Sequence, residues 1–164
     1  MIRYTTFATP LGTMLAAANE DGLTRVDFID SKYMRPVDSQ WREDARYAPL
    51  AACATQLAEY FADQRKVFDL PLSPHGTPFQ ERVWQEIARV PFGETITYST
   101  LAQRAGSPSS SRAAGAATGR NPIAIIVPCH RIVGADGSLT GYAGGLHRKT
   151  HLLELEGVLQ GSLV

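Results

Sequence analysis

The sequence contains only two cysteines and no long apolar run, and each shortage excludes a class of protein. Cys53 and Cys129 are too few for the disulfide framework of a small secreted domain, so we expect two reduced thiols. No stretch of about 18 apolar residues is present, so no transmembrane helix is expected. The first residues also lack the charged and then apolar order of a signal peptide. These absences predict a globular protein of the cytoplasm with no membrane partner.

Net charge is also absent, because 16 basic residues balance 16 acidic ones. Proteins that bind nucleic acid usually carry a basic excess, so the total argues against such a partner. The halves differ, however: residues 1–76 contain eight Lys or Arg and ten Asp or Glu, and residues 77–164 contain eight and six. Between residues 104 and 149, Asp136 stands alone against a set of basic residues. They are Arg104, Arg112, Arg120, Arg131, Arg148 and Lys149. This set predicts either a phosphate-facing surface or an ordinary solvated face with scattered arginines.

The first half of the chain carries the pattern of a small mixed domain. Residues 1–30 alternate apolar and polar positions, with turn signals at Pro10-Leu11-Gly12 and Glu20-Asp21-Gly22, which predicts a β meander. Apolar residues at positions 50, 53, 57 and 61 predict a helix. Residues 69–76 are rich in proline and glycine and mark a boundary. We therefore expect an α+β protein with an N-terminal α/β domain, residues 1–74, and a second domain, residues 77–164.

The second domain is predicted to be mostly helical. It opens with Thr77-Pro78, an N-cap followed by proline at the first helical position. Further helices are expected over residues 97–105, 109–118 and 146–156, and the turn at 106–108 gives the middle pair a helix-turn-helix pattern. Residues 123–127 are expected to form a buried extended run that leads into Cys129.

The helix expected at 109–118 has an unusual composition. Beyond Arg112, residues 113–117 are all alanine or glycine, whereas a helix that reads the major groove normally presents long hydrogen-bonding side chains. Small residues would let the backbone approach the narrower minor groove, with Arg112 projecting from the first turn. Close helix packing in the core explains the same composition, so both interpretations stay open.

Cys129 lies in the pentapeptide Pro-Cys-His-Arg-Ile, beside His130 and Arg131. An imidazole or a guanidinium near a thiol favours the thiolate, which is the nucleophilic form. A buried and inert cysteine at the end of an apolar run explains the same position, because free cysteine is among the most buried residue types. The pentapeptide alone does not decide between these interpretations.

The second half of the chain contains four motifs in order: Asn121-Pro122, Val-Pro-Cys-His-Arg-Ile-Val at 127–133, Gly-Tyr-Ala-Gly-Gly at 141–145, and Leu-Leu-x-x-Glu-Gly at 152–157. Their order and spacing resemble the methylated-DNA protein-cysteine methyltransferases, also called O6-alkylguanine-DNA alkyltransferases, of the bacterial single-protein type. The likeness covers residues 77–157, and the first seventy residues share only length and a β-rich opening. It implies a ribonuclease-H-like first domain followed by a winged helix-turn-helix-like domain.

The resemblance implies DNA repair by direct reversal of damage. The alkyl group of O6-alkylguanine, and also of O4-alkylthymine, would pass from duplex DNA to Cys129. The protein would bind the minor groove, flip the base out of the helix and act only once. Its partner would be alkylated double-stranded DNA, bound by a monomer, with cooperative binding along DNA left open.

The resemblance also implies roles for individual residues. Cys129 would accept the alkyl group, His130 would take the thiol proton through a water molecule, and Glu156 would orient His130. Asn121 would brace the turn that holds the site. The base pocket would be lined by Tyr98, Thr118, Ile132, Tyr142 and Ala143, and the small Thr118 predicts tolerance of bulkier alkyl groups. DNA would be contacted by Arg112, which fills the space of the flipped base, and by Ser107, Ser110, Ser111, Gly115 and Arg120.

Two other function classes compete with this interpretation. A cysteine hydrolase would use the same residue types, although its nucleophile and base usually come from separate segments. A helix-turn-helix regulator would leave Cys129 merely buried, but it would need base-reading side chains at 109–118. We expect no cofactor and no metal, because the two cysteines and four histidines lack ligand-like spacing.

Overall fold

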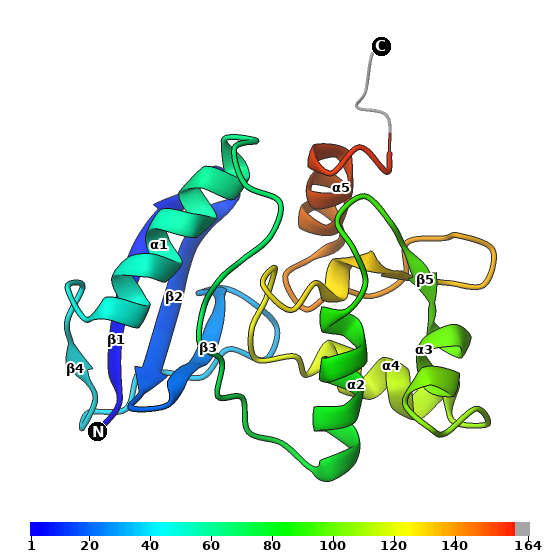
Figure 1. Ribbon diagram of the computed structural model, residues 1–164, viewed down its shortest axis with the longest axis horizontal. Coiled ribbons are helices and arrows are strands. Elements are labelled where there is room, and N and C mark those ends of the chain that lie inside the picture. The colour runs from blue at the N-terminus through cyan, green and yellow to red at the C-terminus, as the bar shows by residue number, and fades with distance from the viewer. Residues whose placement is uncertain (160–164) are drawn as a thin grey trace. The chain divides into compact units, whose positions relative to one another are not determined.

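A computed structural model describes residues 1–159 and contains two compact units. The first unit comprises Met1–His75 together with Pro122–Ala124, and the second comprises Gly76–Asn121 and the chain from Ile125 onward. The first unit combines a sheet with one long helix, and the second is mostly helical, so the expected α+β class is confirmed (Figure 1). Among the described residues, no helix has both the length and the apolar content needed to cross a membrane.

The first unit is built on a four-stranded sheet with the order β3-β2-β1-β4. The strands are β1 (Arg3–Thr9), β2 (Gly12–Asn19), β3 (Gly22–Phe28) and β4 (Arg42–Glu43). The first three form the predicted antiparallel meander, and Gly12 and Gly22 adopt the positive φ values that its tight turns require. Helix α1 (Ala48–Phe61) contacts β1, β2 and β3. It buries Leu50, Cys53, Leu57 and Tyr60.

The outer edge of β3 pairs with two segments from later in the chain. Leu23 forms a parallel bridge with Leu72, and Val26 forms one with Ile123. The second bridge has two backbone hydrogen bonds of 2.8 Å, from Val26 N to Pro122 O and from Ala124 N to Val26 O. The extended run predicted for residues 123–127 is therefore only partly present. It is interrupted by a turn at Ile125, whose φ of 70° lies in the left-handed region.

The second unit contains four α-helices and a two-stranded parallel sheet in its described part. The elements are α2 (Pro78–Ala88), β5 (Ile96–Thr97), α3 (Tyr98–Arg104), α4 (Ser111–Gly119), the 3-10 helix η1 (Cys129–Arg131), β6 (Ile132–Val133) and α5 (Leu146–Leu155). Thr77 caps α2 through a reciprocal capping box with Gln80, as the Thr-Pro opening predicts. Trp84 on α2 is a core residue, and its Nε1 donates to Ala117 O at 2.9 Å.

Helix α4 has small residues on both a buried face and an exposed face. Ala114 and Ala117 are buried where α4 packs against α2 and α3. Arg112, Ala113 and Ala116 are exposed on the other side of the helix. Core packing therefore explains the small residues on one face of α4. The small residues on the other face are exposed to solvent.

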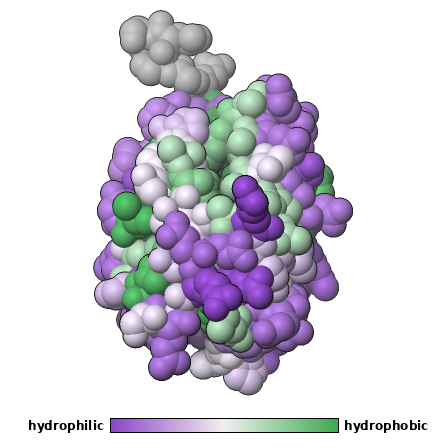
Figure 2. All heavy atoms as spheres, turned by 90° about the vertical axis from the view of Figure 1, so that its left-hand side faces the viewer, coloured by the Kyte–Doolittle hydropathy of each residue, from purple (hydrophilic) through white to green (hydrophobic). Residues whose placement is uncertain are grey.

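The surface is mainly hydrophilic on the face that Figure 2 draws, with hydrophobic residues in separate spots. The large hydrophobic residues that are exposed in the described chain are Met1, Ile29, Val37, Val67, Leu72 and Leu146. They come from distant parts of the sequence. The apolar side chains of both units are otherwise largely buried, as expected for folded domains.

Candidate active site

Cys129 is the first residue of η1 and is 8% exposed. Its backbone N–H donates to Val127 O at 2.8 Å, which tightens the chain around Pro128. Strand β6 follows η1 at once and pairs with β5. The thiol is therefore buried, as the apolar run suggests, but it lies on a short turn between two fixed segments rather than inside a strand.

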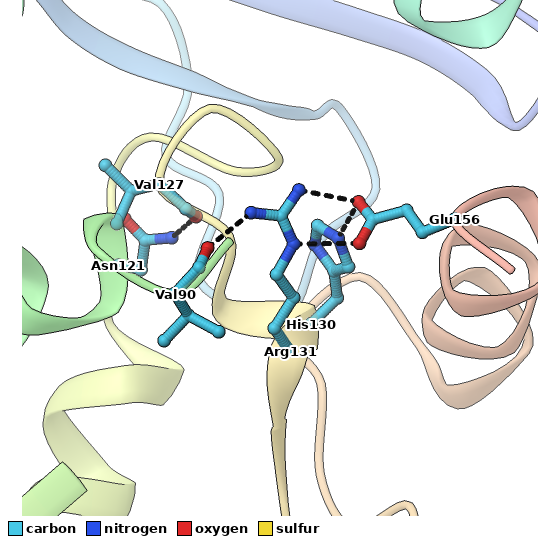
Figure 3. Close-up of polar contacts among 6 residues, drawn as sticks. All are labelled: Val90, Asn121, Val127, His130, Arg131 and Glu156. Atoms are coloured by element: carbon cyan, nitrogen blue, oxygen red, sulfur yellow. Dashed lines mark hydrogen bonds and ion pairs between the residues drawn. The ribbon is translucent and has the colours of Figure 1, made fainter. Parts of the chain in front are cut away.

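His130 and Glu156 form a hydrogen bond in the interior of the second unit. His130 Nε2 lies 2.7 Å from Glu156 Oε2, and both side chains are fully buried (Figure 3). Burial lowers the pKa of His130 and outweighs the hydrogen bond to Glu156, which raises it. His130 Nδ1 has no hydrogen-bond partner among residues 1–159. The neutral imidazole can therefore donate to Glu156 through Nε2 and keep a lone pair on Nδ1.

Arg131 joins the same group, and sequence reasoning missed this role. Its Nε donates to Glu156 Oε1 at 2.8 Å, its Nη2 donates to Oε2 at 2.9 Å, and its Nη1 donates to Val90 O at 2.7 Å (Figure 3). Two parallel bonds of this kind are the strongest pairing between a guanidinium and a carboxylate. Arg131 therefore neutralises the carboxylate that contacts His130. The position of Arg131 two residues after Cys129 is visible in the sequence, but its pairing with Glu156 is not.

Asn121 braces the chain that precedes Cys129. It is buried, and its Nδ2 donates to Val127 O at 2.8 Å, across six residues (Figure 3). The same carbonyl accepts the N–H of Cys129. The Asn121 side chain and the Cys129 backbone are therefore linked through a single acceptor, which limits the conformations open to the turn.

Tyr98 lies at the start of α3, and its hydroxyl donates to Thr140 O at 3.3 Å. Burial raises its pKa, so the phenol stays protonated near neutral pH. Tyr142 and Ala143 follow Thr140 by two and three residues and are half-buried. Ile132 is fully buried, and its carbonyl accepts a hydrogen bond from Lys149, which the sequence placed only in the basic set.

Both halves of the chain match models of one known protein family. Residues 78–158 match the DNA binding domain of 6-O-methylguanine DNA methyltransferase, and residues 2–74 match its ribonuclease-like domain. The chain is 47% identical over 154 residues to the methylated-DNA-protein-cysteine methyltransferase of Methanosarcina acetivorans, covering 94% of this chain and 97% of that one. The chain belongs to the methylated-DNA-protein-cysteine methyltransferase family.

Solved structures of the family agree with this assignment. The O6-methylguanine methyltransferase of Mycobacterium tuberculosis superposes with a TM-score of 0.87 at 41% identity, covering 99% of this chain and 96% of that one. A crystal structure of Mycobacterium tuberculosis OGT in complex with DNA has a TM-score of 0.85 at 42% identity, covering 94% and 92%. Both units of the present chain are therefore included in the likeness.

The residues expected to contact DNA in this methyltransferase-family chain occupy the α3–α4 region. Arg112 and Arg120 are exposed, and Ser107, Ser110 and Ser111 are half-buried. Gly115 faces Tyr98, because a Cβ added at Gly115 would lie 3.7 Å from the tyrosine ring. These positions are compatible with a surface on α4, and their roles stay predictions.

One expectation changes in the structure, and one residue gains a further contact. The set of six basic residues is not one phosphate-facing surface, because Arg131, Arg148 and Lys149 are buried and donate to acceptors inside the second unit. The hydroxyl of Thr118, which was expected in the base pocket, donates to Ala114 O at 2.7 Å within α4. The place of Thr118 in the base pocket stays a prediction.

Proposed function

We propose that the protein repairs DNA by moving the alkyl group from O6 of guanine to Sγ of Cys129. The observation that carries the proposal is the arrangement of His130 beside the thiol-bearing residue. Its Nε2 is engaged by Glu156, and its Nδ1 is the nitrogen left to take the Cys129 proton through a water molecule. The lowered pKa of His130 supports a neutral imidazole, which is the form that can act as a base.

The reaction is a displacement at carbon. His130 takes the thiol proton, Sγ forms a bond to the alkyl carbon, and the bond between that carbon and O6 breaks. The electron pair passes to guanine, whose developing charge would be met by a donor such as the protonated Tyr98 hydroxyl, which would exchange its hydrogen bond to Thr140 O for one to the base. The product thioether has no ready leaving group, so the thiol is not regenerated. We therefore propose a single turnover per molecule.

Double-stranded DNA is proposed to bind across the exposed side of α4. The small Ala113 and Ala116 would let the helix enter the minor groove, and Arg112 would fill the space of the flipped base. Flipping costs a few kcal/mol because the base must leave the stack. The DNA complex of the Mycobacterium tuberculosis relative supports this partner. O4-alkylthymine is proposed as a second substrate, since it offers a comparable alkyl carbon.

The decisive experiment is a mass measurement on intact protein after incubation with duplex DNA that contains O6-methylguanine. We expect one added methyl group per chain, located on the peptide that contains Cys129, and no adduct in Cys129→Ala. Repeated turnover would favour a hydrolase. Binding of DNA without an adduct would favour a regulator, and either result would reject the proposed function.

Base flipping is tested with a matched pair of arginine variants. Arg112→Ala should keep its reaction with free O6-benzylguanine and lose most of its reaction with duplex DNA. Arg104→Ala, which removes another exposed arginine from α3, should change the duplex reaction far less. Similar losses in both variants would indicate a general charge effect rather than insertion of Arg112. Comparing methylated with benzylated guanine in DNA tests whether Thr118 admits bulkier groups.

A further inference from the structure

Lys149 is a fully buried lysine that none of the proposed steps uses. It lies on α5, and its Nζ donates to three backbone carbonyls: Ile132 O at 2.6 Å, Thr140 O at 2.9 Å and Gly141 O at 3.3 Å. Burial of a lysine is costly unless its ammonium group is satisfied by acceptors. Three acceptors match the three N–H bonds of an ammonium group.

These carbonyls come from the two ends of one segment. Ile132 belongs to β6, immediately after η1, whereas Thr140 and Gly141 directly precede Tyr142 and Ala143. Lys149 therefore closes the segment 132–141 on itself. Thr140 O also accepts the Tyr98 hydroxyl, and Lys149 Nζ lies 5.9 Å from the centre of the Tyr98 ring. The ammonium group thus connects three parts of the expected base pocket: Ile132, the Thr140–Gly141 end of the segment, and Tyr98.

The charge of Lys149 interacts with reactive groups around it. Burial lowers the pKa of Lys149 to about 8, and the smaller effect of attraction to Cys129 opposes this shift. The charge of Lys149 also lowers the pKa of His130, and its Nζ lies over the ring of Tyr98. Above that pH a neutral amine has only two N–H bonds and directs a lone pair at the third carbonyl. Deprotonation of Lys149 therefore removes one of its three hydrogen bonds to backbone carbonyls.

We propose that Lys149 is a positioning residue for alkyl transfer: its ammonium group holds the Thr140–Gly141 end of the segment to β6, and so sets Tyr142 and Ala143 relative to Cys129. This inference rests on the proposed function. It concerns where the alkylated base sits, not the intrinsic reactivity of the thiol. The attraction between Lys149 and Cys129 affects every reaction of the thiol, so the positioning role is measured by the ratio of the duplex rate to the rate of a reagent that needs no base pocket.

The first test uses the unaltered protein and two reactions of the same thiol. Single-turnover rates are measured across pH with saturating O6-methylguanine duplex and with iodoacetamide, which is small and needs no pocket. The ratio of the duplex rate to the iodoacetamide rate should fall by about tenfold per pH unit above about 8, because only protonated Lys149 positions the base. A constant ratio would overturn the proposal. If the duplex yields no Cys129 adduct at any pH, the proposed function itself fails.

The second test compares variants. Lys149→Met keeps the length of the side chain without its charge, and we expect a loss of roughly 100-fold with duplex DNA, the size of effect that a misplacement of about 1 Å causes. Its maximal iodoacetamide rate should stay within about threefold of the unaltered protein. Lys149→Arg keeps a permanent charge and should abolish the alkaline fall in the ratio. Lys66→Met, at an exposed site, is the control. Equal losses in both reactions for Lys149→Met would overturn the positioning role.

Discussion

Arg131 donates two hydrogen bonds to Glu156, and the carboxylate that contacts His130 therefore has a buried counter-charge of its own. The oxygen that receives Nη2 of Arg131 is also the one that lies 2.7 Å from His130 Nε2. An unpaired carboxylate at this depth would be strongly destabilised. The folding of the second unit and the orientation of His130 consequently depend on the same ion pair.

Glu156→Gln should destabilise the protein by about 3–5 kcal/mol, because Arg131 would keep a buried charge without its partner. Urea unfolding followed by fluorescence measures this loss. Glu59→Gln is the matched control, since it removes a partly exposed pair with Arg65 and should cost less than about 1 kcal/mol. Similar costs for the two substitutions would contradict the importance of the buried pair.

The buried imidazole predicts a loss of stability on acidification. His130 has a folded-state pKa below its ordinary 6.5, so the folded protein stays neutral at this site while the unfolded chain takes up a proton. Because the unfolded state then binds more protons, the free energy of unfolding should decrease as the pH falls below about 6.5. His130→Gln should weaken this dependence of the unfolding free energy on pH, which urea unfolding at a series of pH values measures. His151→Gln, at an exposed position of α5, should leave the pH dependence unchanged. An equal pH dependence in both variants would reject His130 as the cause of the loss of stability.

The two thiols should differ sharply in reactivity. Cys53 is fully buried on α1, and burial raises the pKa of its thiol to about 12. We therefore expect iodoacetamide at neutral pH to label only Cys129 in the folded protein, and to label both cysteines in urea. Intact mass counts the added groups. Cys53→Ala should leave the folded-state labelling unchanged, and labelling of Cys53 without unfolding would contradict its burial.

Local signals in the sequence were sufficient for much of the fold. The turns and alternation of residues 1–30 predicted β1, β2 and β3, and Thr77-Pro78 predicted the start of α2. Strand β4 was missed because it consists of Arg42 and Glu43, both exposed, and is defined only by backbone pairing with β1. An apolar pattern cannot reveal a strand of this kind.

The site was predictable where it is local and not where it is assembled by folding. The adjacency of Cys129 and His130 is written in the sequence, whereas Arg131 and Glu156 are 25 residues apart and meet only in the folded unit. The basic set was misjudged for the same reason. Charge counts do not separate an exposed Arg112 from a buried Lys149, because burial depends on tertiary neighbours.

The turn before Cys129 contains a buried residue in a strained backbone conformation. Ile125 is 1% exposed and has a φ of 70°, a conformation that costs an L-residue roughly 1–2 kcal/mol and is rarer still for a β-branched one. Ile125→Gly loses buried apolar surface but relieves this strain. Ile123→Gly loses the same side chain from a fully buried position without a positive φ. We therefore expect Ile123→Gly to be the more destabilising by about 1–2 kcal/mol in urea unfolding. Equal losses would indicate that the surrounding structure does not hold Ile125 in a strained state.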